Sequence, residues 1–135
     1  KKYIAICEWD VKKGAQCTIY DVAMQRRRWT LSCPEIESWE FVAVQFSRVK
    51  EDQFLVTLSG GPDWALILWK WDKMEPVAMT KIDPIGPKEG EIPHISFSPH
   101  DEYHIIVTGG GLYKFFSFKT NDKKFIELHS QVNNK

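Results

Sequence analysis

Two pairs of adjacent carboxylates are the residues of this sequence that most directly suggest catalysis. They are Glu51-Asp52 and Asp101-Glu102, and general acid/base catalysis needs two carboxyl groups with separated pKa values facing one substrate. Each pair, however, occupies the same short charged turn after a Phe-Ser dipeptide. The four acids are therefore expected to be solvated at an outer rim, and we predict no catalytic residue and no enzymatic activity.

Two glycine-containing runs, residues 59–61 (Ser-Gly-Gly) and residues 109–111 (Gly-Gly-Gly), have the composition of phosphate-binding loops. A working loop of that kind needs Gly-Lys-Ser/Thr at the start of a helix, where backbone N–H groups and the helix terminus meet the phosphate. A β-type run follows each glycine run instead. We therefore interpret both as turns.

Metal binding is the chemistry suggested by three histidines, His94, His100 and His104, which lie near Asp101. A structural metal site uses paired Cys or His residues at short, fixed spacings. The sequence has no such pairs. We therefore expect no metal ion and no cofactor.

The three cysteines, Cys7, Cys17 and Cys33, lie in or beside apolar runs of β type. Their odd number fits free thiols in a reducing compartment better than a disulfide framework. A thiol in such a run behaves as a small hydrophobic group. We expect these thiols to be buried, and no catalytic triad is predicted.

Charge composition limits the classes of partner. The 18 basic and 18 acidic side chains give a formal net charge of zero, which removes any general attraction to nucleic acids or anionic membranes. The one basic cluster with an aromatic neighbour is Arg26, Arg27 and Arg28 before Trp29. Such a cluster can hold an acidic protein surface or RNA, although solubilising charges at a sheet edge are the simpler interpretation. We predict no nucleic-acid partner and no membrane partner.

The sequence repeats itself at an offset of 51 residues, from position 41 to position 92. Phe41, Val44, Phe46 and Ser47 follow the pattern Φ-x-x-Φ-x-Phe-Ser, which recurs at residues 92–98. Each copy continues with a charged turn, an apolar run ending in Thr-x-x-Gly and two further β-type runs. Agreement over a whole unit indicates repeated structural units rather than isolated sites.

The repeated units read as short strands, because their runs are rich in β-branched and aromatic residues and are punctuated by Gly, Pro, Asp and Asn. Four-stranded antiparallel units of about 40 to 50 residues are what a β-propeller requires. The predicted strands are 41–47, 54–59, 65–72 and 76–82 in one blade, and 94–98, 104–109, 112–119 and 124–129 in the next. The side chains expected to be buried are Phe46, Val56, Leu68, Phe97, Val107 and Phe116.

The periodicity divides the chain into three units. Residues 1–33 are expected to form the last three strands of a blade, residues 34–83 a complete blade, and residues 84–135 a complete blade with a polar C-terminal tail. Because a closed propeller has about four blades or more, this all-β chain of about two and three-quarter blades is predicted to be a fragment that needs the rest of its own propeller. The absence of an initiator Met also suggests a piece of a longer protein.

The repeat resembles the WD-repeat family. The Φ-x-x-Φ-x-Phe-Ser motif before a turn, and the aromatic-Asp pairs Tyr20-Asp21 and Trp71-Asp72, carry this resemblance over essentially the whole chain. No Gly-His pair precedes the first strand of a unit, and Phe118-Lys119 replaces Trp-Asp in the third unit. The His-centred hydrogen-bond network of typical WD blades is therefore not expected. The segments YIAICE, TIYDV, FVAVQFS and PHISFSPHDEYHIIVTGGGLYKFFSF are similar to the large cilia- and flagella-associated WD-repeat proteins of motile axonemes.

This resemblance implies a WD40-type β-propeller and a non-enzymatic scaffold in the axoneme of a cilium or flagellum, within the cytoplasm and cytoskeleton. Its implied role is to organise inner-arm dynein or its regulators on doublet microtubules. The implied partners are other axonemal proteins, from the doublet microtubule, the inner dynein arm or its tether. A cytoplasmic WD-repeat adaptor in a ubiquitin-ligase or translation assembly is the alternative that the residues leave open.

Three tryptophans expected in loops, Trp9, Trp39 and Trp64, are candidate partner-binding residues in addition to the arginine cluster. In a propeller the loops between second and third strands and those between blades open on one face, and exposed aromatics there are typical interface anchors. The alternative is that each ring folds back between blades. By contrast, Trp69 and Trp71 lie where aromatic residues recur, so we expect them to pack between blades.

Overall fold

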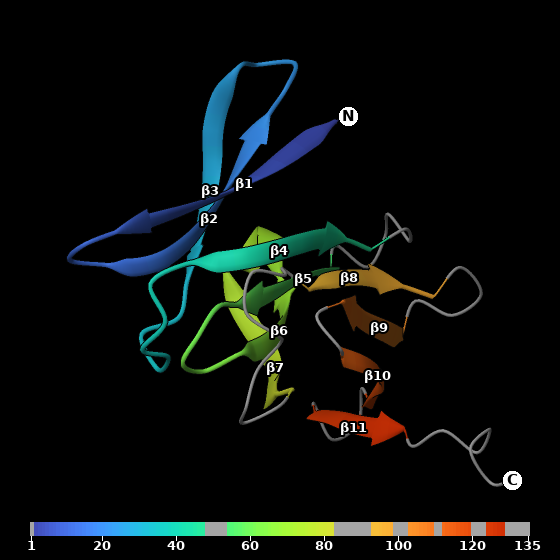
Figure 1. Cartoon of the computed structure of the whole chain (residues 1–135). Helices are drawn as coiled ribbons and strands as arrows, with labels where there is room; N and C mark the ends of the chain where they lie inside the picture. The colour runs from blue at the N-terminus through green and yellow to red at the C-terminus, as the bar shows by residue number, and fades with distance from the viewer. Residues whose placement is uncertain are drawn as a thin grey trace, which may run out of the picture.

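The computed structural model describes residues 2–47, 54–82, 93–98, 103–109, 112–119 and 124–128. Within these residues the chain forms strands and one short 3-10 helix, and the strands make three antiparallel sheets. The sheets follow one another along the chain and are stacked like successive blades (Figure 1).

The first sheet contains β1 (Tyr3–Asp10), β2 (Gly14–Asp21) and β3 (Arg26–Ser32) in the order β1-β2-β3. Its strands pair through short turns, so their registers are set locally. The first turn ends at Gly14, whose φ of 80° is a left-handed conformation that glycine adopts without a Cβ clash. The pairing of β1 with β2 is unbroken from Tyr3 opposite Asp21 to Asp10 opposite Gly14.

The second sheet contains β4 (Phe41–Phe46), β5 (Phe54–Ser59), β6 (Ala65–Lys70) and β7 (Glu75–Lys81) in that order. A 3-10 helix, η2 (Trp71–Lys73), connects β6 to β7. Strand β6 is a continuous apolar run because both of its faces are covered. This sheet is therefore the middle layer of the chain.

The third sheet contains β8 (His94–Phe97), β9 (His104–Gly109), β10 (Leu112–Lys119) and β11 (Lys124–Leu128). Its order is β11-β10-β9-β8, so each strand pairs with its neighbour in sequence. The two four-stranded sheets thus have the same up-and-down topology.

Two apolar cores lie on opposite faces of the second sheet. Ile67 and Trp69 pack with residues of the first sheet, including Ile19, whereas Leu66 and Leu68 pack with residues of the third sheet. Successive side chains of β6 therefore enter different cores, as the period of a strand requires. Face-to-face burial of this kind is what joins the blades of a propeller.

The structure agrees with the predicted strands within a residue or two at most ends and corrects two details. The strand expected over 65–72 ends at Lys70, because Trp71 enters η2 and Met74 takes a left-handed conformation with a φ of 54°. Phe46 is half-buried rather than buried, because it is the last residue of β4 and lines a groove. Confirmed as buried are Val56, Leu68, Phe97, Val107 and Phe116.

Two further expectations have different outcomes. Cys17 and Cys33 are buried, but Cys7 is only partly buried, because β1 lies at the edge of its sheet. The four acidic turn residues expected to be solvated, at positions 51, 52, 101 and 102, lie outside the described residues.

Candidate partner surface

The clearest exposed feature is a pair of stacked tryptophans, Trp9 and Trp39. Their ring centroids are 6.3 Å apart with an interplanar angle of 22°. Trp9 lies in β1 near its end, and Trp39 lies in the loop before β4. Their exposed fractions are 57% and 60%, so both residues offer surface to a partner. Two rigid aromatic groups together offer a large contact area at a small entropic cost.

The loop that carries Trp39 is held by Asp63. One carboxylate oxygen of Asp63, Oδ2, accepts the backbone N–H groups of Glu37 at 2.6 Å and Ser38 at 2.8 Å. The hydroxyl oxygen of Ser38 lies 2.9 Å from the same Oδ2 and 2.7 Å from the carbonyl oxygen of Gly60. These contacts join the loop before β4 to the loop between β5 and β6. Trp39 therefore follows directly after a fixed anchor rather than a free loop.

The electrostatics of this anchor favour the carboxylate form of Asp63. Burial raises the pKa of Asp63. The hydrogen bonds from the side chain and backbone of Ser38 and from the backbone of Glu37, together with the charge of Lys81, lower this pKa by more than burial raises it. The net pKa is below the ordinary value. The Lys81 Nζ atom lies 3.6 Å from Asp63 Oδ1. Asp63 is therefore charged at neutral pH and its hydrogen bonds are charge-assisted.

Trp64 does not join the stacked pair. Its backbone has a φ of 47°, its side chain is half-buried against the core between the second and third sheets, and its carbonyl oxygen accepts the N–H of Ile82 at 3.0 Å. Its indole also lies against Gly61. The structure thus brings together two of the three tryptophans predicted to lie in loops, but it corrects the position of Trp9, which lies in strand β1 because the β1–β2 pairing continues to Asp10.

Trp69 and Trp71 are buried, which confirms their predicted packing role. The indole Nε1 of Trp69 donates to Thr57 Oγ1 at 2.9 Å, so its polar atom is satisfied inside the core. The ring of Trp71 lies 5.1 Å from that of Tyr3 and 5.0 Å from that of Trp29, both in the first sheet. Trp71 therefore joins the first and second sheets.

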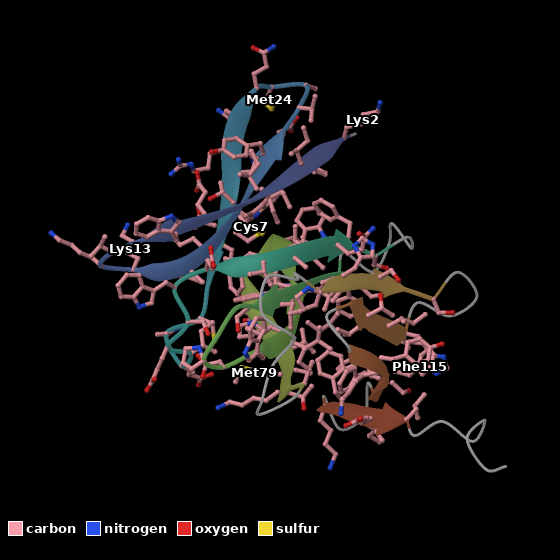
Figure 2. All side chains as sticks on the ribbon, in the orientation of Figure 1. Lys2, Cys7, Lys13, Met24, Met79 and Phe115 are labelled. Atoms are coloured by element: carbon pink, nitrogen blue, oxygen red, sulfur yellow. The ribbon has the colours of Figure 1, made fainter. Side chains whose placement is uncertain are left out.

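The arginine cluster lies at the other end of the first sheet from Trp9. Arg26 is opposite Asp21, which is opposite Tyr3 at the start of β1. Figure 2 shows this separation through Met24, in the β2–β3 turn, and Lys13, in the β1–β2 turn. The two candidate surfaces are thus distinct.

The three arginines have different surroundings. Arg28 Nη1 lies 3.7 Å from the buried carboxylate of Asp21, and its guanidinium lies 4.7 Å from the ring centroid of Trp29. Arg26 and Arg27 are exposed on β3. Arg28 therefore helps to hold the sheet, whereas Arg26 and Arg27 are available to a partner.

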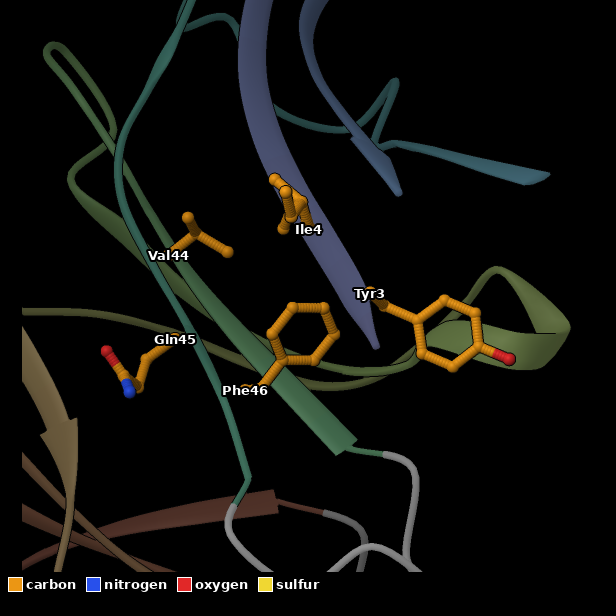
Figure 3. A pocket seen from close by; sticks show the side chains of 6 residues that line it. Tyr3, Ile4, Val44, Gln45 and Phe46 are labelled. Carbon is orange, nitrogen blue, oxygen red and sulfur yellow. The ribbon is translucent and has the colours of Figure 1, made fainter. Parts of the chain in front are cut away.

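A groove of about 270 Å³ separates β1 from β4. Its lining comes from the two strands alone, and Figure 3 shows the side chains of Ile4, Val44 and Phe46 around it. Within the described residues β1 pairs only with β2, so one edge of β1 is open. Ile4 and Ile6 on this strand have exposed fractions of 50% and 44%. An open edge with exposed apolar side chains is a surface on which another strand can pair.

The part of the chain that the structure describes contains neither a cluster of metal-ligating side chains nor a membrane-spanning helix. Within these ranges no three His, Cys, Asp or Glu side chains are grouped closely enough to hold a metal ion. His100 and Asp101 lie outside these ranges. Among the same residues no helix is long and apolar enough to cross a membrane.

Sequence reasoning missed the Asp63–Ser38 anchor. These residues are 25 positions apart, and neither belongs to the Φ-x-x-Φ-x-Phe-Ser repeat. The only sequence signal is the position of Asp63 in a Gly-Gly-Pro-Asp run, where an aspartate usually caps its own turn. The hydrogen-bond partner of Asp63 lies in another loop, and the two loops come together only when the strands of the sheet have paired.

Three successive antiparallel sheets, one of three strands and two of four, are stacked face to face around shared apolar cores and define a segment of a WD40-type β-propeller. The solved structures support this class. A chain of the crystal structure of the mitotic checkpoint complex aligns with a TM-score of 0.63 over 93% of this chain and 35% of that one. At 15% identity this likeness concerns the fold alone.

The particular relatives are cilia- and flagella-associated proteins. Cilia- and flagella-associated protein 57 of Mus musculus is 29% identical over 130 residues, which is 95% of this chain and 10% of the relative. Cilia- and flagella-associated protein 57 A of Tetrahymena thermophila is 30% identical over 108 residues, which is 76% of this chain and 8% of the relative. The expected resemblance is thereby confirmed, and the chain spans a tenth or less of these relatives. No protein-family model matches the chain.

Proposed function

We propose that this chain is a non-enzymatic scaffold segment of a ciliary axonemal WD-repeat protein. Its role is to organise inner-arm dynein or its regulators on doublet microtubules, in the cytoskeleton of a cilium or flagellum. The observation that carries the proposal is the similarity over 95% of the chain to a protein named as cilia- and flagella-associated. The relative from a ciliate supports the same assignment.

The stacked pair Trp9 and Trp39 is the proposed partner-binding surface. The pair is exposed, and the anchor formed by Asp63 and Ser38 fixes the loop that carries Trp39. A preorganised aromatic anchor loses little conformational entropy on binding. Arg26 and Arg27 form a second proposed surface, suited to an acidic protein such as the surface of a microtubule. Trp64 and Arg28 support the fold next to these surfaces.

The open edge of β1 is proposed to pair with a further strand of the same propeller. In the second sheet, β4 occupies the position next to β5, and β1 is the counterpart of β5 because Tyr3 and Phe54 are 51 positions apart. The position next to β1 is thus where the first strand of a blade lies. This supports the division into residues 1–33, 34–83 and 84–135 and the requirement for the rest of the propeller.

The test compares epitope-tagged complete proteins in a ciliated cell. A protein with both Trp9→Ala and Trp39→Ala is expected to bind isolated axonemes at least about 30-fold more weakly than the wild type, since one interface aromatic contributes ~2 kcal/mol or more. Tyr113→Ala is the matched control, because Tyr113 is an exposed aromatic side chain of β10 in the third sheet, which carries neither proposed surface.

Two outcomes separate the parts of the proposal. If the wild-type protein does not enter the cilium, the axonemal function is wrong. If the wild type binds axonemes and the double variant binds equally well, the function stands but the tryptophan surface is wrong.

A further inference from the structure

Two cysteines face each other directly across the first hairpin. Cys7 of β1 is opposite Cys17 of β2, in a register without a bulge. The backbone N–H of Val22 donates to the carbonyl oxygen of Lys2 at 3.1 Å, which makes Lys2 and Val22 a hydrogen-bonded pair. Because these pairs alternate along an antiparallel ladder, Cys7 and Cys17 form a non-hydrogen-bonded pair.

The spacing of such a pair suits a disulfide. Residues opposite each other in a non-hydrogen-bonded pair have Cα atoms about 4.5 Å apart, with their side chains on one face. Disulfides join Cα atoms that are about 4.4 to 6.8 Å apart. Cys7 and Cys17 are free thiols in this structure. The backbone can therefore accept either state, dithiol or disulfide, with little rearrangement.

The two thiols differ in access and acidity. Cys17 is buried, whereas Cys7 is only partly buried. The hydrogen bond between the thiols lowers the pKa of Cys7 and raises that of Cys17, and burial raises both. The net pKa of Cys7 is below the ordinary value, so Cys7 is the more nucleophilic partner.

We propose that Cys7 and Cys17 form a peroxide-sensitive dithiol, in which Cys7 is the residue oxidised first and Cys17 is the resolving cysteine. The Cys7 thiolate attacks one oxygen of hydrogen peroxide, the O–O bond breaks, and sulfenic acid and hydroxide form. The proton lost from the Cys7 thiol converts this hydroxide to water. The Cys17 sulfur then attacks the Cys7 sulfur, and its proton leaves with the sulfenic oxygen as a second water.

The step balances without another reactant. Two thiols and one peroxide give one disulfide and two waters, so the sulfurs lose the two electrons that the peroxide oxygens gain. The product links β1 covalently to β2. This site is independent of the proposed scaffold function, because neither thiol belongs to the tryptophan surface.

Cys33 has different surroundings and serves as the internal control. It is buried, its Sγ atom lies 3.9 Å from Glu35 Oε1, and burial raises its pKa above the ordinary value. No thiol is placed opposite it by the strand register of the first sheet. The proposal therefore predicts oxidation of one cysteine pair and not of Cys33.

The test uses the complete protein, reduced and then freed of reductant. It is treated with hydrogen peroxide, its remaining thiols are blocked with N-ethylmaleimide, and it is digested without reduction for mass spectrometry. The expected product is a linked pair of peptides containing Cys7 and Cys17, lighter by two hydrogen atoms than the reduced peptides and lost on treatment with dithiothreitol. This measurement needs no substituted protein.

The opposite results are equally clear. Recovery of both residues as maleimide adducts, linkage of Cys7 to any other cysteine, or further oxidation of Cys7 while Cys17 stays reduced overturns the proposal. Cys17→Ser is expected to leave a Cys7 sulfenic acid that dimedone traps, and Cys7→Ser to leave Cys17 unmodified. Cys33→Ser is expected to leave the linked pair unchanged.

Discussion

Asp63 accepts the backbone N–H of Ser38 at 2.8 Å and so connects two loops that are 25 residues apart in the sequence. Replacing Asp63 by Ala leaves the N–H groups of Glu37 and Ser38 without an acceptor. An unsatisfied buried donor costs about 1–3 kcal/mol, so we expect residues 36–40 to open more easily by a similar amount. Hydrogen exchange of these amides measures the change.

The control for Asp63→Ala is Glu75→Ala. Glu75 is an exposed carboxylate of the same sheet, at the start of β7. Its removal is expected to change exchange at residues 36–40 by less than about 0.5 kcal/mol, as is usual for exposed sites. Equal exchange in both variants would show that Asp63 is not the anchor of this loop.

The same carboxylate predicts an acid sensitivity of the loop. Because the pKa of Asp63 is depressed in the folded protein, the carboxylate contributes stability above the unfolded pKa of about 3.9. That contribution is lost as the pH falls through the lower folded value. The difference in stability between wild type and Asp63→Asn is therefore expected to be constant near neutrality and to shrink below about pH 4. Acid titrations of loop opening in the two proteins measure this difference, and a gap that persists at lower pH contradicts it.

Replacement by Ala is expected to affect the stability of the protein very differently at Trp71 and at Trp39. Trp71 is buried among Tyr3, Trp29 and Phe46, so Trp71→Ala is expected to lose about 3–5 kcal/mol through a core cavity. Trp39 is exposed, so Trp39→Ala is expected to change stability by about 0.5 kcal/mol or less. Chemical denaturation of the complete protein compares them. Similar losses in both variants would place Trp39 in the core and remove the proposed partner surface.

Trp64 is the residue for which the sequence and the structure lead to different tests. Its place in a loop suggests that Trp64→Ala weakens partner binding and leaves folding nearly intact. Its half-buried ring against the core instead predicts a loss of stability between those of Trp39→Ala and Trp71→Ala. The same denaturation series distinguishes the two. A stability loss as small as that of Trp39→Ala, with weaker axoneme binding, restores Trp64 to the partner surface.

The sequence predicted the strands well because their signals are local. Runs such as residues 65–69 are apolar throughout, and the recurrence at 51 positions fixed where each run belongs in its unit. The repeat pattern predicted that Trp9 and Trp39 share one face, but the Asp63–Ser38 contact and the stacking of Trp9 on Trp39 follow from no local pattern. The pairing of Cys7 with Cys17 likewise depends on the length of one turn, since a shift by one residue changes every partner.

The open edge of β1 gives the last prediction. By the alternation that makes Lys2 and Val22 a hydrogen-bonded pair, the N–H of Ala5 points away from β2 and toward the open edge, whereas that of Ile6 points toward β2. Proline removes the backbone donor. Ala5→Pro is therefore expected to spare the pairing of β1 with β2 and to remove a bond to an added strand, and Ile6→Pro to disrupt the hairpin itself.

Hydrogen exchange in the complete protein separates these cases. For Ala5→Pro we expect faster exchange at the amides of the added strand, by about 1 kcal/mol for one lost hydrogen bond, with the β2 amides unchanged. Ala5→Ser keeps the N–H and is the control. If the complete protein with Ala5→Pro exchanges like the Ala5→Ser protein at every amide, no strand pairs with this edge.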